Sequence, residues 1–161
     1  MKEPENYLGI SLGVRRLGFA IGSKAELLDW RIKGFDETYS KKKVKKIWRV
    51  IEQTILRNDI QVIGVKLPPK YSRTDGIQQC MQYITRNALE KGIILFYYDL
   101  EAIELHYLKG NAKNTATIAE AISDKYPELK REFFKLSKKC QYHIKMFEAV
   151  AAMELASLEA L

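Results

Sequence analysis

The segment Gln61–Leu67 constrains the fold most strongly, because it is a nearly continuous apolar run between Asp59 and Pro68-Pro69. A short run of this kind suits a strand that is buried on both faces, which requires helices on both sides of a sheet. Residues 93–98 form a second such run. Both segments are therefore expected to be central strands of one sheet.

The rest of the chain separates into strand-like and helix-like segments. Turn residues divide three β-forming segments near the N-terminus, and apolar residues at helical spacing mark five helices. This order predicts an α/β fold in which a three-strand antiparallel meander and two parallel strands form a five-stranded mixed sheet, with helices on both faces. The three further strands are expected at 7–12, 17–21 and 26–35, and the helices at 41–55, 75–91, 100–108, 115–125 and 142–158.

Length and composition favour a single domain over residues 1–161 and an anionic partner. Lys and Arg number 27 against 20 Asp and Glu, which gives a net charge of +7 and favours a polyanion such as nucleic acid. Cys80 and Cys140 are the only cysteines, which argues against a structural zinc site. The sequence has no signal-peptide pattern and no apolar run of about 18 residues. We therefore expect a cytoplasmic protein that does not associate with membranes.

Three segments, taken in order, carry a family resemblance. Residues 7–20, YLGISLGVRRLGFA, are similar to the I-D-x-G-x-x-x-x-G-x-A opening hairpin of RuvC-like Holliday junction resolvases. Residues 98–113 resemble the fifth strand, helix and G-N-x-A-type loop of that family, and residues 145–151 lie where it carries D-x-x-D-A-x-A. The resemblance implies a ribonuclease H-like fold. It also implies binding to branched DNA and allows a homodimer.

The sequence departs from the family where the family's chemistry lies. The resemblance implies two divalent metals held by four carboxylates, but Ser11, Lys66 and Lys145 occupy three of those positions and only Glu148 is acidic. Two Mg²⁺ ions about 4 Å apart need several carboxylate oxygens. The sequence therefore predicts a degenerate site with no cofactor, and Mg²⁺ only if a nuclease activity persists.

Each of these residues has alternative interpretations. Ser11 is either a small strand residue in the space of a lost aspartate or a weak metal ligand. Lys66 binds phosphate, pairs with Glu148 or points to solvent. Glu148 is a remnant ligand or the partner of Lys145, three residues earlier on the same helical face. Asp99 caps the following helix or supplies an alternative catalytic acid.

Several basic residues are candidates for contacting nucleic acid. Arg15 and Arg16 lie in the first hairpin turn, and Lys66 and Lys113 lie in the segments that resemble the family's cleft. The Lys41–Lys46 cluster is interpreted mainly as the solvated face of an amphipathic helix, although phosphate contact or a localisation signal are alternatives.

Three functions remain open at this point. The first is a nucleic-acid-binding, resolvase-like protein that has lost metal-dependent nuclease activity. The second is an active structure-specific endonuclease that uses Glu148 and Asp99 in a rearranged site. The third is a protein-interaction module in which the apolar last helix builds a dimer.

Overall fold

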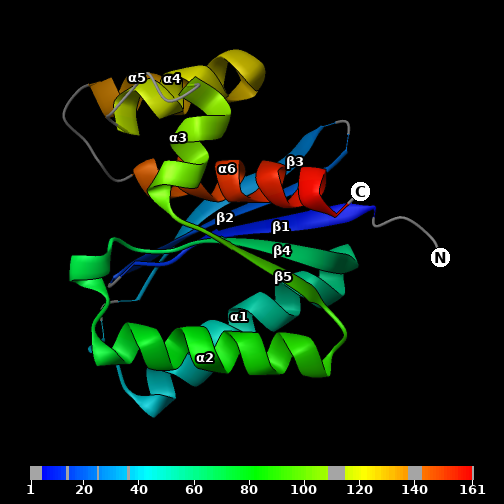
Figure 1. The fold of residues 1–161 in the computed structure, drawn as a ribbon, viewed down its shortest axis with the longest axis vertical. Helices are drawn as coiled ribbons and strands as arrows, with labels where there is room; N and C mark the ends of the chain where they lie inside the picture. Colours follow the sequence, from blue (N-terminus) through cyan, green and yellow to red (C-terminus); the bar gives the residue numbers. More distant parts are fainter. Residues whose placement is uncertain are drawn as a thin grey trace.

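A five-stranded mixed sheet forms the centre of the protein in a computed structural model (Figure 1). The structure describes residues 5–13, 15–24, 26–35, 37–108, 115–137 and 143–160. The strand order is β3-β2-β1-β4-β5; β1, β2 and β3 pair antiparallel, whereas β4 is parallel to both β1 and β5. The predicted meander and parallel pair are thus confirmed. The strands are β1 (Asn6–Ser11), β2 (Arg16–Ser23), β3 (Leu27–Gly34), β4 (Ile60–Lys66) and β5 (Ile94–Tyr98).

Strand β5 corrects one expectation, since it lies at an edge of the described sheet and not at its centre. Leu95 and Tyr97 pack toward the core beneath one face of the sheet, while Phe96 packs toward the core on the other face. A continuous apolar run therefore reports that both faces are covered. Such a run does not indicate whether both edges of the strand are paired. Ile94, at the start of β5, is half exposed.

Helices cover both faces of the sheet, as predicted (Figure 1). Helices α1 (Lys41–Asn58) and α2 (Asp75–Glu90) lie on one face, and α6 (Ile144–Glu159) lies on the other. Beyond α6 lie α3 (Leu100–Leu108), α4 (Thr115–Lys125) and α5 (Lys130–Ser137). Two 3₁₀ turns, η1 (Lys70–Ser72) and η2 (Pro127–Leu129), complete the described elements. The helix at 130–137 was not predicted.

Helix α6 is part of the core. Residues around most of its circumference are buried, because it packs on β1, β2 and β4 on one side and against α4 and α3 on the other. The apolar side chains of α6 are therefore buried against other elements of the same chain. Few of its residues are exposed, which leaves little surface for the dimer that this helix was expected to build.

Glycines let the backbone of α6 approach the sheet closely. A Cβ atom at Gly9 would overlap the carbonyl oxygen of Ala149, and one at Gly64 would overlap that of Ala152. The same holds at Gly18, where the carbonyl oxygen of Lys145 occupies the space. These three glycines, one each on β1, β4 and β2, set the distance between α6 and the sheet.

The lysine cluster at the start of α1 is not uniformly solvated. Ser40 caps this helix as predicted, with its hydroxyl accepting a hydrogen bond from the Lys43 backbone N–H at 3.2 Å. Lys43 itself is buried, and its ammonium group donates to the carbonyl oxygen of Phe35 at 3.2 Å and lies 4.2 Å from the centre of the Tyr39 ring. The solvated interpretation holds for the other lysines of Lys41–Lys46, which are exposed.

Candidate functional site

Strands β1 and β4 end side by side and bring three of the predicted site residues together. Ser11 pairs with Lys66 in the parallel register, and Glu148 approaches both from the first turns of α6. The Ser11 hydroxyl donates to Glu148 Oε1 at 2.9 Å, and Lys66 Nζ lies 2.8 Å from Glu148 Oε2. All three side chains are buried. The predicted convergence is confirmed, and the interpretation in which Lys66 points to solvent is wrong.

Lys145 completes this group from the same face of α6. Its Nζ lies 3.5 Å from Glu148 Oε1 and donates to the Leu12 carbonyl oxygen at 3.2 Å. The ion pair predicted from the spacing of Lys145 and Glu148 is therefore present, together with the pair to Lys66. Of the two lysines, Lys145 is the more accessible, with 22% of its side chain exposed against 4% for Lys66. We call Ser11, Lys66, Lys145 and Glu148 the charged cluster.

The electrostatics of the charged cluster keep Glu148 ionised. Burial raises the pKa of this carboxyl group, but Lys145, Lys66 and the hydrogen bonds from Lys66 and Ser11 outweigh it, so that the pKa is lowered below 4.5. Burial also lowers the pKa of Lys145, against the attraction of Glu148. With one carboxylate and two ammonium groups, the cluster carries a formal charge of +1 at neutral pH.

The side chains of the charged cluster do not fit a divalent metal. Magnesium is bound by several oxygen ligands, commonly carboxylates, whereas here both oxygens of the one carboxylate already contact ammonium groups. A cation placed between Lys66 and Lys145 would meet two like charges at close range. Within the described ranges, no three His, Cys, Asp or Glu side chains come together as a metal site.

Asp99 lies at the end of β5 and serves as a helix cap. Its Oδ1 accepts a hydrogen bond from the Ala102 backbone N–H at 2.9 Å, and its side chain is exposed. The capping role proposed from the sequence is therefore present. Asp99 also lines a cavity with Lys66, which places it near the charged cluster although no contact joins the two carboxylates.

This cavity, of about 420 Å³, opens where β4 and β5 end. Its wall includes the loop that follows β4, where Lys70 and Arg73 flank Tyr71, whose side chain is 91% exposed. The Arg73 guanidinium is fixed by a hydrogen bond from Nε to the Pro68 carbonyl oxygen at 2.9 Å. Sequence reasoning assigned no role to this loop. The sequence feature that could have indicated this loop is an aromatic residue, Tyr71, among cations directly after two prolines.

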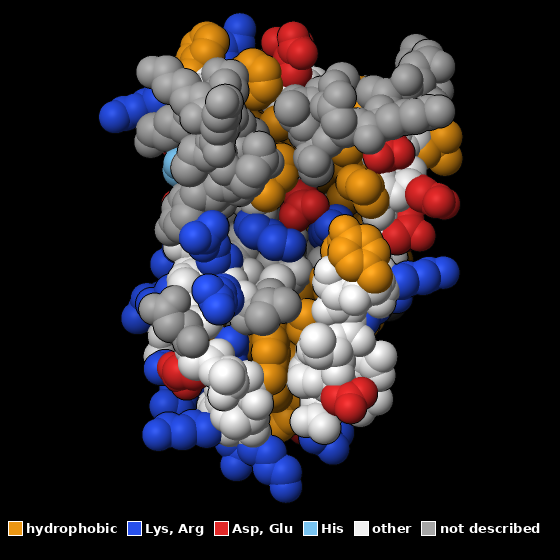
Figure 2. Space-filling model, turned by 90° about the vertical axis from the view of Figure 1, so that its left-hand side faces the viewer, with side chains coloured by type: hydrophobic (Ala, Val, Ile, Leu, Met, Phe, Trp, Pro, Cys, Tyr) orange, Lys and Arg blue, Asp and Glu red, His pale blue; other side chains and the backbone are white. Residues whose placement is uncertain are grey.

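The β1–β2 turn lies on the other side of the charged cluster. Tyr39 fixes this turn through a hydrogen bond from its hydroxyl to the Gly13 carbonyl oxygen at 2.9 Å, and the Phe35 N–H donates to the Arg15 carbonyl oxygen at 2.7 Å. The side chains of Arg15 and Arg16 are exposed. Figure 2, which shows the end of the molecule where β1 and β4 finish, has Lys and Arg side chains gathered across its middle. Lys113, also predicted to contact nucleic acid, lies outside the described residues.

Acid should weaken the charged cluster. Because the folded-state pKa of Glu148 lies below its ordinary value, its stabilising contribution is present above about pH 4.5 and is lost as the pH falls through the lower, folded-state pKa. At neutral pH, we expect the unfolding free energy of the native chain to be larger than that of a Glu148→Gln variant. This difference should decrease as the pH is lowered. Urea titrations at about pH 7 and about pH 3 measure it. A difference that is independent of pH would contradict the assignment.

Comparison with known proteins places the fold. No protein-family model and no curated protein matches the sequence. Among solved structures, RuvC of Thermus thermophilus bound to a Holliday junction substrate superimposes with a TM-score of 0.67 at 14% identity, covering 93% of this chain and 90% of RuvC. The yeast mitochondrial Holliday junction resolvase Ydc2 gives a TM-score of 0.68 at 10% identity, covering 97% of this chain and 80% of Ydc2.

A viral resolvase gives a similar result. The fowlpox virus resolvase in complex with Holliday junction DNA superimposes with a TM-score of 0.56 at 8% identity, covering 97% of this chain and 99% of the viral chain. These three matches each extend over at least 93% of this chain and therefore include its mixed five-stranded sheet. The chain therefore has the ribonuclease H-like fold of RuvC-type Holliday junction resolvases.

Proposed function

We propose that this chain is a nucleic-acid-binding, RuvC-like protein, with branched DNA as its target, and that it has lost metal-dependent nuclease activity. The observation that carries the proposal is the charged cluster: at the end of β1 and β4, lysines stand where the resemblance expects metal-binding carboxylates. Three similar structures are resolvases, and two of them are complexes with Holliday junctions. This supports the choice of target.

The surface around the charged cluster suits a phosphate backbone. Arg15 and Arg16 are exposed on one side of it, and Lys70 and Arg73 line the cavity on the other. Within the cluster, Lys145 is the ammonium group that a phosphate reaches first, because Lys66 is almost fully buried against Glu148. Lys66 then contributes through its charge and by holding Glu148 in place.

The same cluster argues against hydrolysis at this position. A metal ion activates water by lowering its pKa and stabilises the charge that develops on the leaving oxygen. An ammonium group can neutralise a phosphate, but it does not generate hydroxide from water. The alternative nuclease built on Glu148 and Asp99 would have to release Glu148 from two lysines first.

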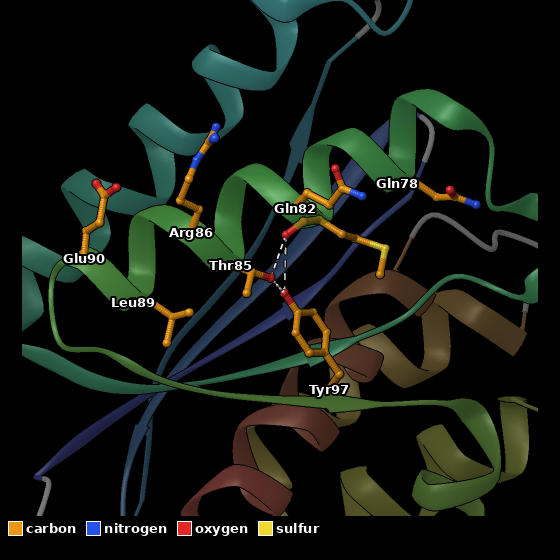
Figure 3. Close-up of a pocket in the computed structure, with 8 residues that line it drawn as sticks. Gln78, Gln82, Thr85, Arg86, Leu89, Glu90 and Tyr97 are labelled. Carbon is orange, nitrogen blue, oxygen red and sulfur yellow. Dashed lines mark hydrogen bonds between the residues drawn. The ribbon is translucent and has the colours of Figure 1, made fainter.

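A protein-interaction module that forms a homodimer is the second candidate, favoured by one groove. Helix α2 and the edge strand β5 enclose about 590 Å³, with Leu89 and Tyr97 on the wall (Figure 3). Leu89 is 65% exposed, and such an apolar site beside an unpaired strand edge is typical of interaction surfaces. Equilibrium sedimentation of the native chain and of a Leu89→Glu variant tests this candidate: a dimer that the variant abolishes would support it.

Salt dependence of binding tests the main proposal. The logarithm of the affinity for duplex DNA falls by about 0.9 per neutralised phosphate for each unit of log salt, so that three or four contacts give a slope near −3. An Arg15→Ala/Arg16→Ala variant should bind all sequences more weakly and flatten this slope by about 2. Fluorescence anisotropy with single-stranded, duplex and four-way-junction DNA measures both.

The Lys41–Lys46 cluster supplies a control, because its exposed lysines lie on α1, on the face of the sheet opposite α6 (Figure 1). Reversing the charge of Lys42 and Lys46 should affect binding less than loss of the two arginines. If no salt-sensitive binding occurs at low ionic strength with any of the three DNA forms, the proposal fails.

A further inference from the structure

A second groove runs between α1 and α2, on the helical layer opposite α6. It encloses about 460 Å³, and seven residues line it: Lys41, Val44, Lys45, Gln79, Gln82, Tyr83 and Arg86. In Figure 3, Arg86 leaves the outer surface of α2 in the direction of α1, away from Leu89 and Tyr97. The groove is therefore distinct from the one beside β5, although Gln82 and Arg86 border both.

All charged residues that line this groove carry positive charge. Three of its lining residues, Lys41, Lys45 and Arg86, are cations, and none is a carboxylate. All three are exposed, and none forms an ion pair with another described residue. By contrast, Lys46, one residue further along α1, is paired with Glu37 at 2.6 Å. Three uncompensated cations around one hollow favour an anionic occupant.

The remaining lining residues indicate a peptide. Val44 and Tyr83 supply an apolar surface, and the guanidinium carbon of Arg86 lies 5.6 Å from the centre of the Tyr83 ring. The amides of Gln79 and Gln82 can each donate and accept hydrogen bonds, as peptide groups require. Lys41 and Lys45 are one helical turn apart, about 6 Å along α1, which is close to the separation of alternate residues in an extended chain.

We propose that the groove between α1 and α2 is a docking site for an acidic peptide segment of a partner protein, with at least two carboxylates on alternate residues and an apolar side chain beside them. This inference does not depend on the nucleic-acid proposal. A hollow of about 460 Å³ lies within the range of pockets that take small ligands or a few side chains, and it does not admit a DNA duplex. A second copy of this chain would bring a net charge of +7 toward the cationic groove, which disfavours it as the occupant.

A labelled octapeptide of alternating glutamate and leucine is a direct probe, with alternating glutamine and leucine as its uncharged counterpart. Anisotropy at about 50 mM salt should show binding of the acidic peptide to the full chain and at least tenfold weaker binding of the neutral one. A Lys41→Glu/Lys45→Glu variant, and separately Arg86→Glu, should weaken binding of the acidic peptide about tenfold, since each reversal turns attraction into repulsion.

A Lys33→Glu/Lys42→Glu variant changes the net charge by the same amount at exposed residues outside the groove, and it should bind the peptide within about twofold of the native chain. Equal weakening in this control would reveal nonspecific attraction and overturn the proposal, as would absence of binding to the native chain. Loss of DNA affinity in Lys41→Glu/Lys45→Glu, comparable with its loss of peptide affinity, would assign the groove to a nucleic-acid strand. Displacement of the peptide by self-association of the chain would assign it to a second copy.

Discussion

A Glu148→Ala variant is expected to lose about 3–5 kcal/mol of unfolding free energy at neutral pH, because removing one member of a buried ion network leaves uncompensated charges behind. Here the carboxylate contacts Lys66 at 2.8 Å, Lys145 at 3.5 Å and the Ser11 hydroxyl at 2.9 Å. Without it, Lys66 is a buried ammonium group with no counter-ion in the charged cluster. Urea-induced unfolding followed by circular dichroism measures the loss.

The companion variants separate charge from packing. Lys145→Met should cost much less than Glu148→Ala, because the ammonium group it removes is the more exposed one and Glu148 keeps its contact with Lys66. A Lys66→Met/Glu148→Leu variant, which removes the buried pair together, should recover much of the loss. Equal stabilities for native chain and Glu148→Ala would show that the network does not form in solution.

Introducing carboxylates at positions 11, 66 and 145 should produce a metal site in place of the charged cluster. The native chain is expected to show no Mg²⁺- or Mn²⁺-dependent cleavage of four-way junctions. The Ser11→Asp/Lys66→Glu/Lys145→Asp variant places four carboxylates together, at the ends of β1 and β4 and in the first turns of α6. We expect this variant to bind Mn²⁺, detected by the paramagnetic relaxation of water, and to gain measurable cleavage.

Ser11→Asp alone is the control, and it should remain inactive. Its new carboxylate would lie beside Lys66 and Lys145, adding one more ion pair to the cluster without creating a site for metal. Cleavage by the native chain that disappears in Glu148→Ala would refute the loss of activity and favour the nuclease that uses Glu148 and Asp99.

Much of the fold could be predicted because it depends on local patterns. Ser40 marks the start of α1, and the run ending at Lys66 marks a strand covered on both faces. The position of β5 at the edge could not be read from its residues, since apolar faces leave the same pattern in central and edge strands. Nor could the burial of Lys43, which depends on carbonyl groups of the preceding loop and the Tyr39 ring.

The candidate site shows the same division. Its members and their convergence were implied by the resemblance to RuvC-like resolvases, and the pairing of Lys145 with Glu148 followed from helical spacing. The pairing of Lys66 with the same carboxylate was one of three open alternatives, because it depends on how deeply α6 lies on the sheet. The cavity with Lys70, Tyr71 and Arg73 arises from the path of a loop, which sequence periodicity does not describe.

The glycines beneath α6 hold the helix on the sheet independently of the side chains that it presents at this end of the molecule. Because Gly9, Gly18 and Gly64 fix the helix through contacts with its main chain, the side chains that α6 presents at Lys145 and Glu148 can be exchanged without moving the frame that carries them. A helix held in this way can therefore carry either acidic residues, which bind metal, or lysines, which bind phosphate, and a few substitutions exchange the two. At the three glycines, by contrast, any side chain would overlap the main chain of α6.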